Sequence, residues 1–289
     1  MPIKGVRRAS CWLLAASFVC LLSASAAAQN TSIWISNIDG SGARRLAAIE
    51  GYVDHSFPRW SHDGKYVAFD GQRQTGGLTR TLFVVQADGN DVRDLGIGTT
   101  PTWSADDKQL ACYCFVISGQ TQVVVLNVDG SGRTAVAMGK GPCWSPDGSK
   151  MVATDTKNVS LTDLVSGETR DLFIEPFDEV YRGFRFTPDG KRLAVVARAQ
   201  PAGPRRLLLV DLDGEKPQIT NRLQADMGGS VSFSPDGKRV LYSNEYKLYT
   251  LALDSNDPPH LIPNQQGKSS MPDWSPDGKQ VVFTSDRSE

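Results

Sequence analysis

The sequence predicts an all-β protein, a six-bladed β-propeller built from four-stranded antiparallel blades. The first observation behind this prediction is a short phrase that occurs six times, at intervals of 41 to 47 residues. A fixed period near 40 residues with several short strands per unit indicates a radial or solenoid array. The second observation is that each end of the chain supplies half of a repeat, as a closed ring requires.

Each phrase contains an aromatic anchor followed by a turn. The anchors are Trp60, Trp103, Trp144, Phe186, Phe233 and Trp274. In the turn, as at 145–148, proline presets φ, aspartate can bond the local backbone and glycine adopts the left-handed conformation. In the second copy Asp107 stands where the others have glycine, and aspartate tolerates that geometry. One anchor per repeat predicts packing between blades rather than a cofactor site.

The strands of each repeat follow in order. Four copies have a proline before the anchor, and because proline lacks an N–H it belongs on an edge strand, here the innermost one: Pro58, Pro101, Pro142 and Pro272. After the turn, alternating apolar residues such as those of 193–197 predict the second strand. A third apolar strand usually ends in Asp-Gly or Ser-Gly, which is a hairpin signal. A short, more polar fourth strand, such as 92–96, completes the blade.

The two chain ends predict how the ring closes. The last copy, from Pro272, supplies only two strands before Glu289. Segments 32–40 and 43–48 resemble the third and fourth strands of a repeat. We therefore expect two N-terminal strands to pair with two C-terminal strands as the sixth blade, within one propeller domain over 29–289.

Residues 1–28 have a different character. Lys4, Arg7 and Arg8 form a basic start, 11–22 is apolar, and small residues at 26–28 precede Gln29. This pattern is typical of a secretory signal peptide and is too short for a transmembrane anchor. It predicts a periplasmic or secreted protein without membrane insertion.

Composition and missing motifs narrow the function classes. A net charge of −1 gives no indication of nucleic-acid binding. The three histidines (His55, His62 and His260) lack zinc-ligand spacing, and neither a nucleophile elbow nor a phosphate-binding loop is present. We expect no metal, no cofactor and no catalysis, and a monomer. Cys112, Cys114 and Cys143 allow one disulfide to Cys143 or three free buried thiols, and we favour free thiols.

Function in a propeller usually lies where loops converge around the channel mouth. Polar and aromatic residues on and before the innermost strands are therefore the candidate partner-binding site: His55, Arg59, Asp178, Glu179, Tyr181, Arg182, Arg185, Asp226, Lys268 and Asp273. Together they form a polar ring of mixed charge, and such a ring of loops and unpaired inner strand edges can accept an extended segment or a loop of a protein or peptide partner.

Two motifs carry a family resemblance: the repeated Trp-Ser-Pro-Asp-Gly-Lys phrase, and Asp-Gly-Ser-Gly-x-Arg-Arg-Leu at 39–46. Over the whole chain after residue 28, the sequence resembles the TolB-type propeller repeat. The Gly-His and Trp-Asp signatures of WD repeats are absent. The resemblance implies a periplasmic propeller that binds a protein, as TolB binds the peptidoglycan-associated lipoprotein of the Tol-Pal system. TolB also has a separate N-terminal domain. In this sequence only a few residues lie between the predicted signal peptide and the first expected strand, so we expect that domain to be missing. The alternatives are a polysaccharide lyase or hydrolase with a cryptic channel site, or a purely structural envelope module.

Overall fold

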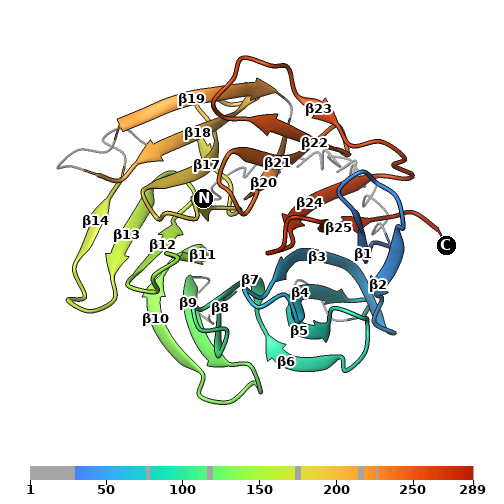
Figure 1. The fold of residues 1–289 in the computed structure, drawn as a ribbon. Coiled ribbons are helices and arrows are strands. Elements are labelled where there is room, and N and C mark those ends of the chain that lie inside the picture. Colours follow the sequence, from blue (N-terminus) through green and yellow to red (C-terminus); the bar gives the residue numbers. More distant parts are fainter. Residues whose placement is uncertain are drawn as a thin grey trace, which may run out of the picture.

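The computed structural model describes residues 30–75, 79–115, 120–172, 177–213, 218–225 and 227–288. Its strands form six antiparallel sheets arranged as a ring around a central axis, here called the channel axis (Figure 1). This confirms the predicted all-β, six-bladed propeller. Within these ranges no helix is long and apolar enough to cross a membrane. The predicted signal peptide lies outside the described residues.

Each of the first five blades follows the chain from the channel outwards, as the repeat predicts. Blade one is β3 (Tyr52–Trp60), β4 (Tyr66–Arg73), β5 (Arg80–Gln86) and β6 (Arg93–Ile97). Blade two is β7 (Thr99–Trp103), β8 (Gln109–Phe115), β9 (Thr121–Asn127) and β10 (Thr134–Met138). Blade three is β11 (Lys140–Trp144), β12 (Lys150–Thr154), β13 (Val159–Asp163) and β14 (Thr169–Asp171).

In blade four the innermost strand is split in two. Its parts, β15 (Glu179–Val180) and β16 (Arg185–Phe186), both pair with β17 (Arg192–Arg198), which is followed by β18 (Arg205–Asp211) and β19 (Gln218–Ala225). Blade five is β20 (Met227–Phe233), β21 (Arg239–Asn244), β22 (Lys247–Ala252) and β23 (His260–Leu261). The four strands that carry a proline before the anchor are all innermost edge strands, as expected.

The sixth blade joins the two ends of the chain. It consists of β24 (Ser269–Trp274), β25 (Gln280–Ser285), β1 (Ser32–Asn37) and β2 (Arg44–Ala47), in that order from the channel. Strand β1 pairs with β25 along its full length, from Ser32 opposite Ser285 to Asn37 opposite Gln280. Figure 1 shows the blue β1 beside the red β25. The predicted ring closure is therefore confirmed.

The turns after the anchors have the predicted conformations. Turn glycines such as Gly148, with φ of 74°, are left-handed, and Asp107 adopts φ of 56° at the same position in blade two. Within the turn of blade three, the Ser145 hydroxyl donates to the Asp147 carboxylate over 2.5 Å. The Ser149 amide donates to the same carboxylate over 3.0 Å. These hydrogen bonds lower the pKa of Asp147 to about 2.

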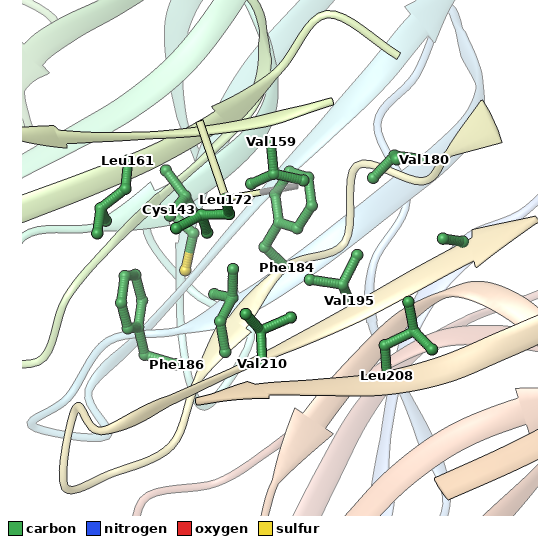
Figure 2. Close-up of a cluster of buried hydrophobic side chains, with 13 residues drawn as sticks. Cys143, Val159, Leu161, Leu172, Val180, Phe184, Phe186, Val195, Leu208 and Val210 are labelled. Atoms are coloured by element: carbon green, nitrogen blue, oxygen red, sulfur yellow. The ribbon is translucent and has the colours of Figure 1, made fainter. Parts of the chain in front are cut away.

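The core lies between neighbouring blades. Between blades three and four, Cys143, Val159 and Leu161 of one blade meet Phe186 and Val195 of the other (Figure 2). The anchors take part in these clusters, as the spacing predicted; Trp60, for example, packs with apolar residues of the sixth and first blades. Burying such side chains contributes roughly 25 cal/mol per Å² of apolar surface, so each blade is stabilised by its neighbours.

A bulge interrupts most of the innermost strands about three residues before the anchor. The residues there have left-handed φ values in four blades: Phe57 at 50°, Thr100 at 53°, Gly141 at 58° and Met271 at 51°. Residues 54–57 lie inside β3 because the strand continues through this bulge. A bulge bends the strand and redirects its side chains. The residues that follow it line the channel.

Candidate functional site

A cavity of about 330 Å³ opens at the end of the channel that carries the anchor turns. All six blades contribute to it through their anchors and the residues just before them. Turn residues from five blades also line it: His62, Pro146, Pro188, Pro235 and Pro276. Its walls are therefore aromatic rings and proline rings, the kind of lining common in binding sites.

Three charged residues from three different blades meet at this cavity. Arg185 Nη2 donates to Asp273 Oδ1 over 2.9 Å, and Arg59 Nη1 lies 4.0 Å from the same oxygen. Asp273 Oδ2 accepts the Trp60 amide at 2.9 Å. Arg59 also donates from Nη2 to the Ser230 hydroxyl over 3.1 Å. The structure thus brings together the three predicted site residues Arg59, Arg185 and Asp273.

Burial and mutual charge control this cluster. Burial raises the pKa of Asp273, but Arg185 and Arg59 outweigh it and hold the pKa below its ordinary value of 3.8. Burial and then the positive charge of Arg185 lower the pKa of Arg59 to about 9. Even so, Arg59 remains protonated at neutral pH. Two guanidinium groups therefore share one carboxylate.

Other predicted residues lie at the starts of the innermost strands, toward the opposite end of the channel. Arg198 of β17 pairs with Asp178 over 3.4 Å and with Glu179 over 2.6 Å. Arg182 is exposed, and its Nη1 donates to the Tyr113 hydroxyl of blade two. The arginine thus bridges from blade four across blade three.

The remaining predicted residues have more local surroundings. Tyr181 is half-buried, with the Arg205 guanidinium 4.5 Å from its ring centroid. Lys268 is exposed, and its ammonium lies 5.3 Å from the Tyr246 ring centroid. Asp226 lies outside the described residues. Tyr181 and Lys268 do not join the cluster at the cavity.

His55 is buried rather than presented at a mouth. Its Nδ1 lies 2.6 Å from the Thr31 carbonyl, and its Nε2 accepts the Ile49 amide at 3.0 Å. With one nitrogen donating and the other accepting, the ring is a neutral imidazole. Burial, the largest influence, lowers its pKa. His55 anchors the segment before β1 to β3.

Sequence reasoning missed a second charged network, which joins blades one and two. Asp70 is fully buried and accepts the Thr99 hydroxyl and the Thr100 amide, each at 2.7 Å. Arg80 donates to it and also pairs with Asp54 over 2.8 Å. Burial raises the pKa of Asp70 although Arg80 opposes the shift. The sequence signal that could have revealed this network is the aspartate, Asp70, within the otherwise apolar segment 66–70.

The turn residues that form the rim of the cavity were also not predicted as site residues, because their prolines were assigned only to turn geometry. Their constant offset from each anchor places them all at the same end of the channel, and this spacing was visible in the sequence.

The cysteines and metal-binding residue types do not form a site among the described residues. Cys112, Cys114 and Cys143 are free thiols, and Cys114 is only half-buried. No group of three His, Cys, Asp or Glu side chains in the described ranges could hold a metal ion.

Two curated relatives bear the names of peptidases. The chain is 27% identical over 234 residues to dipeptidyl-peptidase 5 of Porphyromonas endodontalis, covering 71% of this chain and 32% of that protein. It is 32% identical over 154 residues to the uncharacterized peptidase YuxL of Bacillus subtilis, covering 50% of this chain and 21% of that protein. The chain thus spans a third or less of the length of these relatives. No family model matches it.

Solved structures share the fold at low identity. A putative TolB from Agrobacterium tumefaciens has a TM-score of 0.68 at 18% identity, covering 89% of this chain and 98% of that chain. TolB from Acinetobacter baumannii has a TM-score of 0.62 at 15% identity, covering 90% and 64%. An oligogalacturonate lyase in complex with manganese has a TM-score of 0.57 at 14% identity, covering 84% and 76%.

These comparisons correct one expectation from the sequence. The absence of catalytic motifs predicted a protein that is not an enzyme, and this prediction is contradicted by the two relatives named as peptidases and by the lyase of similar fold. The physical reason is that a propeller can carry or accompany many kinds of chemistry, so missing short motifs exclude little. The resemblance to the TolB-type repeat, by contrast, is confirmed at the level of fold: the chain is a six-bladed propeller of the kind seen in the TolB structures.

Proposed function

We propose that this chain is an exported propeller, periplasmic or secreted, that binds an extended protein or peptide segment in the channel cavity. The observation that carries the proposal is the cavity of about 330 Å³, which has aromatic and proline walls beside a buried charged cluster. Apolar walls with a few fixed polar groups are the usual design of a binding pocket. Aromatic and arginine side chains also supply most binding hot spots.

The proposal includes processing of the N-terminus and a monomeric propeller over 29–289. A partner equivalent to the peptidoglycan-associated lipoprotein would suit an envelope location. Intact-mass measurement of exported protein tests the first part, because cleavage before Gln29 removes residues 1–28. Retention of Met1 in exported protein contradicts it.

A second candidate function is that the cavity delivers peptide segments to a peptidase activity. The match to dipeptidyl-peptidase 5 over 71% of this chain favours it. Release of chromophore from dipeptidyl nitroanilide substrates by purified protein, absent from a mock purification, would support this candidate. The lack of any release, by the chain alone or with envelope extract, would remove it.

The experiment for the main proposal is a pull-down from envelope extract with four immobilised proteins: wild type, Arg185→Ala, Arg182→Ala and Arg170→Ala. Arg185 lines the cavity, Arg182 lies toward the other channel end, and Arg170 is an exposed residue of the outer strand β14. We expect Arg185→Ala alone to lose the partner, by about 2 kcal/mol or more. Loss with Arg182→Ala alone, or equal loss with Arg170→Ala, places the interface elsewhere and contradicts the proposal.

A further inference from the structure

Within the cavity lining, positive charge exceeds negative charge. The charged lining residues are Arg59, Arg185 and Asp273, and His62 at the rim adds no negative charge. Their side chains are 5%, 15% and 9% exposed, respectively. Buried charges are costly unless each is paired. Within the cluster two guanidinium groups therefore face one carboxylate where water screens charge poorly, and Asp70, which lies outside the lining, attracts Arg59 more weakly than Asp273 does.

The carboxylate of Asp273 carries one negative charge, which the two arginines already share. One oxygen accepts Arg185 and lies at ion-pair distance from Arg59, and the other accepts the Trp60 amide. The arginines, by contrast, have donors to spare. A guanidinium carries five N–H groups. Among the described residues, the hydrogen bonds of Arg59 go to Pro58 and Ser230, and those of Arg185 go to Phe184 and Asp273.

The position of Arg185 makes its spare donors accessible from the cavity. It is the more exposed of the two arginines, and both line the same space. An anion placed there would relieve the repulsion between the two guanidinium groups, which Asp273 only partly offsets. Guanidinium groups recognise carboxylates by short, charge-assisted hydrogen bonds.

We propose that the cavity selects a carboxylate of the bound peptide, with Arg185 as its principal partner and Arg59 as the second. This inference rests on the proposed function and adds its chemical specificity. The acidic group enters toward the arginines, and apolar residues beside it contact the anchor rings and the turn prolines. The carboxylate comes from a glutamate or aspartate side chain, or from a peptide C-terminus.

The test uses four N-terminally fluorescein-labelled hexapeptides of one sequence, Ala-Leu-Ala-X-Leu-Ala, measured by fluorescence anisotropy. X is Glu or Gln, and the C-terminus is free or amidated, so the set separates the two sources of a carboxylate. We expect at least one carboxylate-bearing peptide to bind about tenfold or more tightly than the fully neutral peptide. The preference falls as salt rises, because screening weakens charge pairing.

Variants assign the preference to the cluster. Arg185→Met removes the charge but keeps an apolar stem, so it abolishes the preference, whereas Arg185→Lys retains part of it and Arg170→Met retains all of it. Asp273→Asn removes the competing carboxylate and strengthens binding of the acidic peptide. Near-UV circular dichroism checks that each variant is folded. If Arg185→Met does not fold, the other two variants test the inference: Arg185→Lys should weaken the preference, and Asp273→Asn should strengthen binding of the acidic peptide.

The outcomes separate the inference from the proposed function. Equal affinity for neutral and acidic peptides overturns carboxylate selection but leaves peptide binding in place. Binding of oligogalacturonate that depends on Arg185, with no binding of any peptide, overturns both the peptide ligand and the proposed function. No binding of any probe at millimolar concentration overturns both as well.

Discussion

Gly141 shows how one residue without a side chain lets two blades approach. It has φ of 58°, and a Cβ there would lie 2.6 Å from both the carbonyl oxygen and the Cβ of Arg182. Gly51 has a similar φ of 78°, but a Cβ there would meet nothing within 4 Å. The two glycines share the same backbone requirement and differ in their surroundings.

Alanine at these two positions therefore separates backbone strain from steric contact. Gly51→Ala is expected to cost about 1 kcal/mol of unfolding free energy, from the left-handed conformation alone. Gly141→Ala adds an overlap with backbone atoms and is expected to cost at least about 2 kcal/mol more. Urea unfolding of both variants measures the difference; equal losses would mean that β11 and the 181–184 segment can move apart freely.

Cys114 is the thiol that the structure prepares for reaction. It is half-buried, whereas Cys112 and Cys143 are buried. The influence of the neighbouring Cys112 thiol, together with that of Arg133, outweighs burial and lowers the pKa of Cys114. Since the thiolate is the nucleophile, Cys114 is expected to react first with iodoacetamide. The rate should rise with pH at a lower pH than for an ordinary thiol, and peptide mapping identifies the residue. Faster labelling of Cys143 contradicts this prediction.

At the scale of elements, the anchor turns of neighbouring blades pack against each other around the ring. A Cβ built on a turn glycine would lie 3.3 to 3.9 Å from the turn residue of the preceding blade, which is a proline in four of five cases, as for Gly237 and Pro188. Blades one and two depart from this in a matched way. His62 replaces the proline of one turn, and Asp107 replaces the glycine of the next.

The Asp107 carboxylate satisfies the groups that this replacement exposes. It accepts the amide of His62 at 2.9 Å and the amide of Asp63 at 2.8 Å, and it lies 2.8 Å from His62 Nδ1. A proline at position 62 has no N–H to offer. The two departures from the repeat therefore compensate each other.

A double-mutant cycle tests this compensation. His62→Pro and Asp107→Gly each remove hydrogen bonds, so each alone is expected to lower the unfolding free energy by about 1–2 kcal/mol. The double variant recreates the pairing found in the other blades, so the two losses should not add, and the coupling should reach about 1 kcal/mol or more. Strictly additive losses in urea unfolding would show that the two turns are independent.

At the scale of the whole molecule, the repeated turn makes stability depend on acid. The turn aspartate has a lowered pKa in all six blades: Asp63, Asp106, Asp147, Asp189, Asp236 and Asp277. As pH falls, the unfolded chain therefore binds protons at a higher pH than the folded protein does. The contribution of these carboxylates to the free energy of unfolding is thus fully present above the ordinary pKa of 3.8. It is lost as pH falls through the folded values, which reach about 2 for Asp147.

We therefore expect the urea midpoint of unfolding to fall steadily from about pH 4 to pH 2. Asp147→Asn, which cannot titrate, should unfold more easily at neutral pH and show a shallower decline. A midpoint that is flat across this range would show that the turn carboxylates do not contribute through their charge.

The fold was largely predictable from the sequence because it depends on local signals that repeat. Three kinds of signal indicate the same fold: the six turns, the edge prolines, and the half-repeats at the two ends of the sequence. The site was predictable only in part. Arg59, Arg185 and Asp273 share the position before the anchor, so the repeat places them together. The hydrogen bonds that bury His55 and join Arg182 to Tyr113 depend on bulges and tertiary contacts that the repeat does not encode.

The blade made from both chain ends has a consequence for the order of folding. Strand β1, whose Ile33, Trp34 and Ile35 are all buried, finds its partner in β25, about 250 residues further along the chain. Pairs so distant in sequence form slowly, because a long loop must close before any contact is gained. During synthesis at ~5–20 residues per second, β1 can pair with β2 but lacks its β25 partner for roughly 10–50 s. The seam of the ring is thus the last part to form and the part most exposed to aggregation until it does.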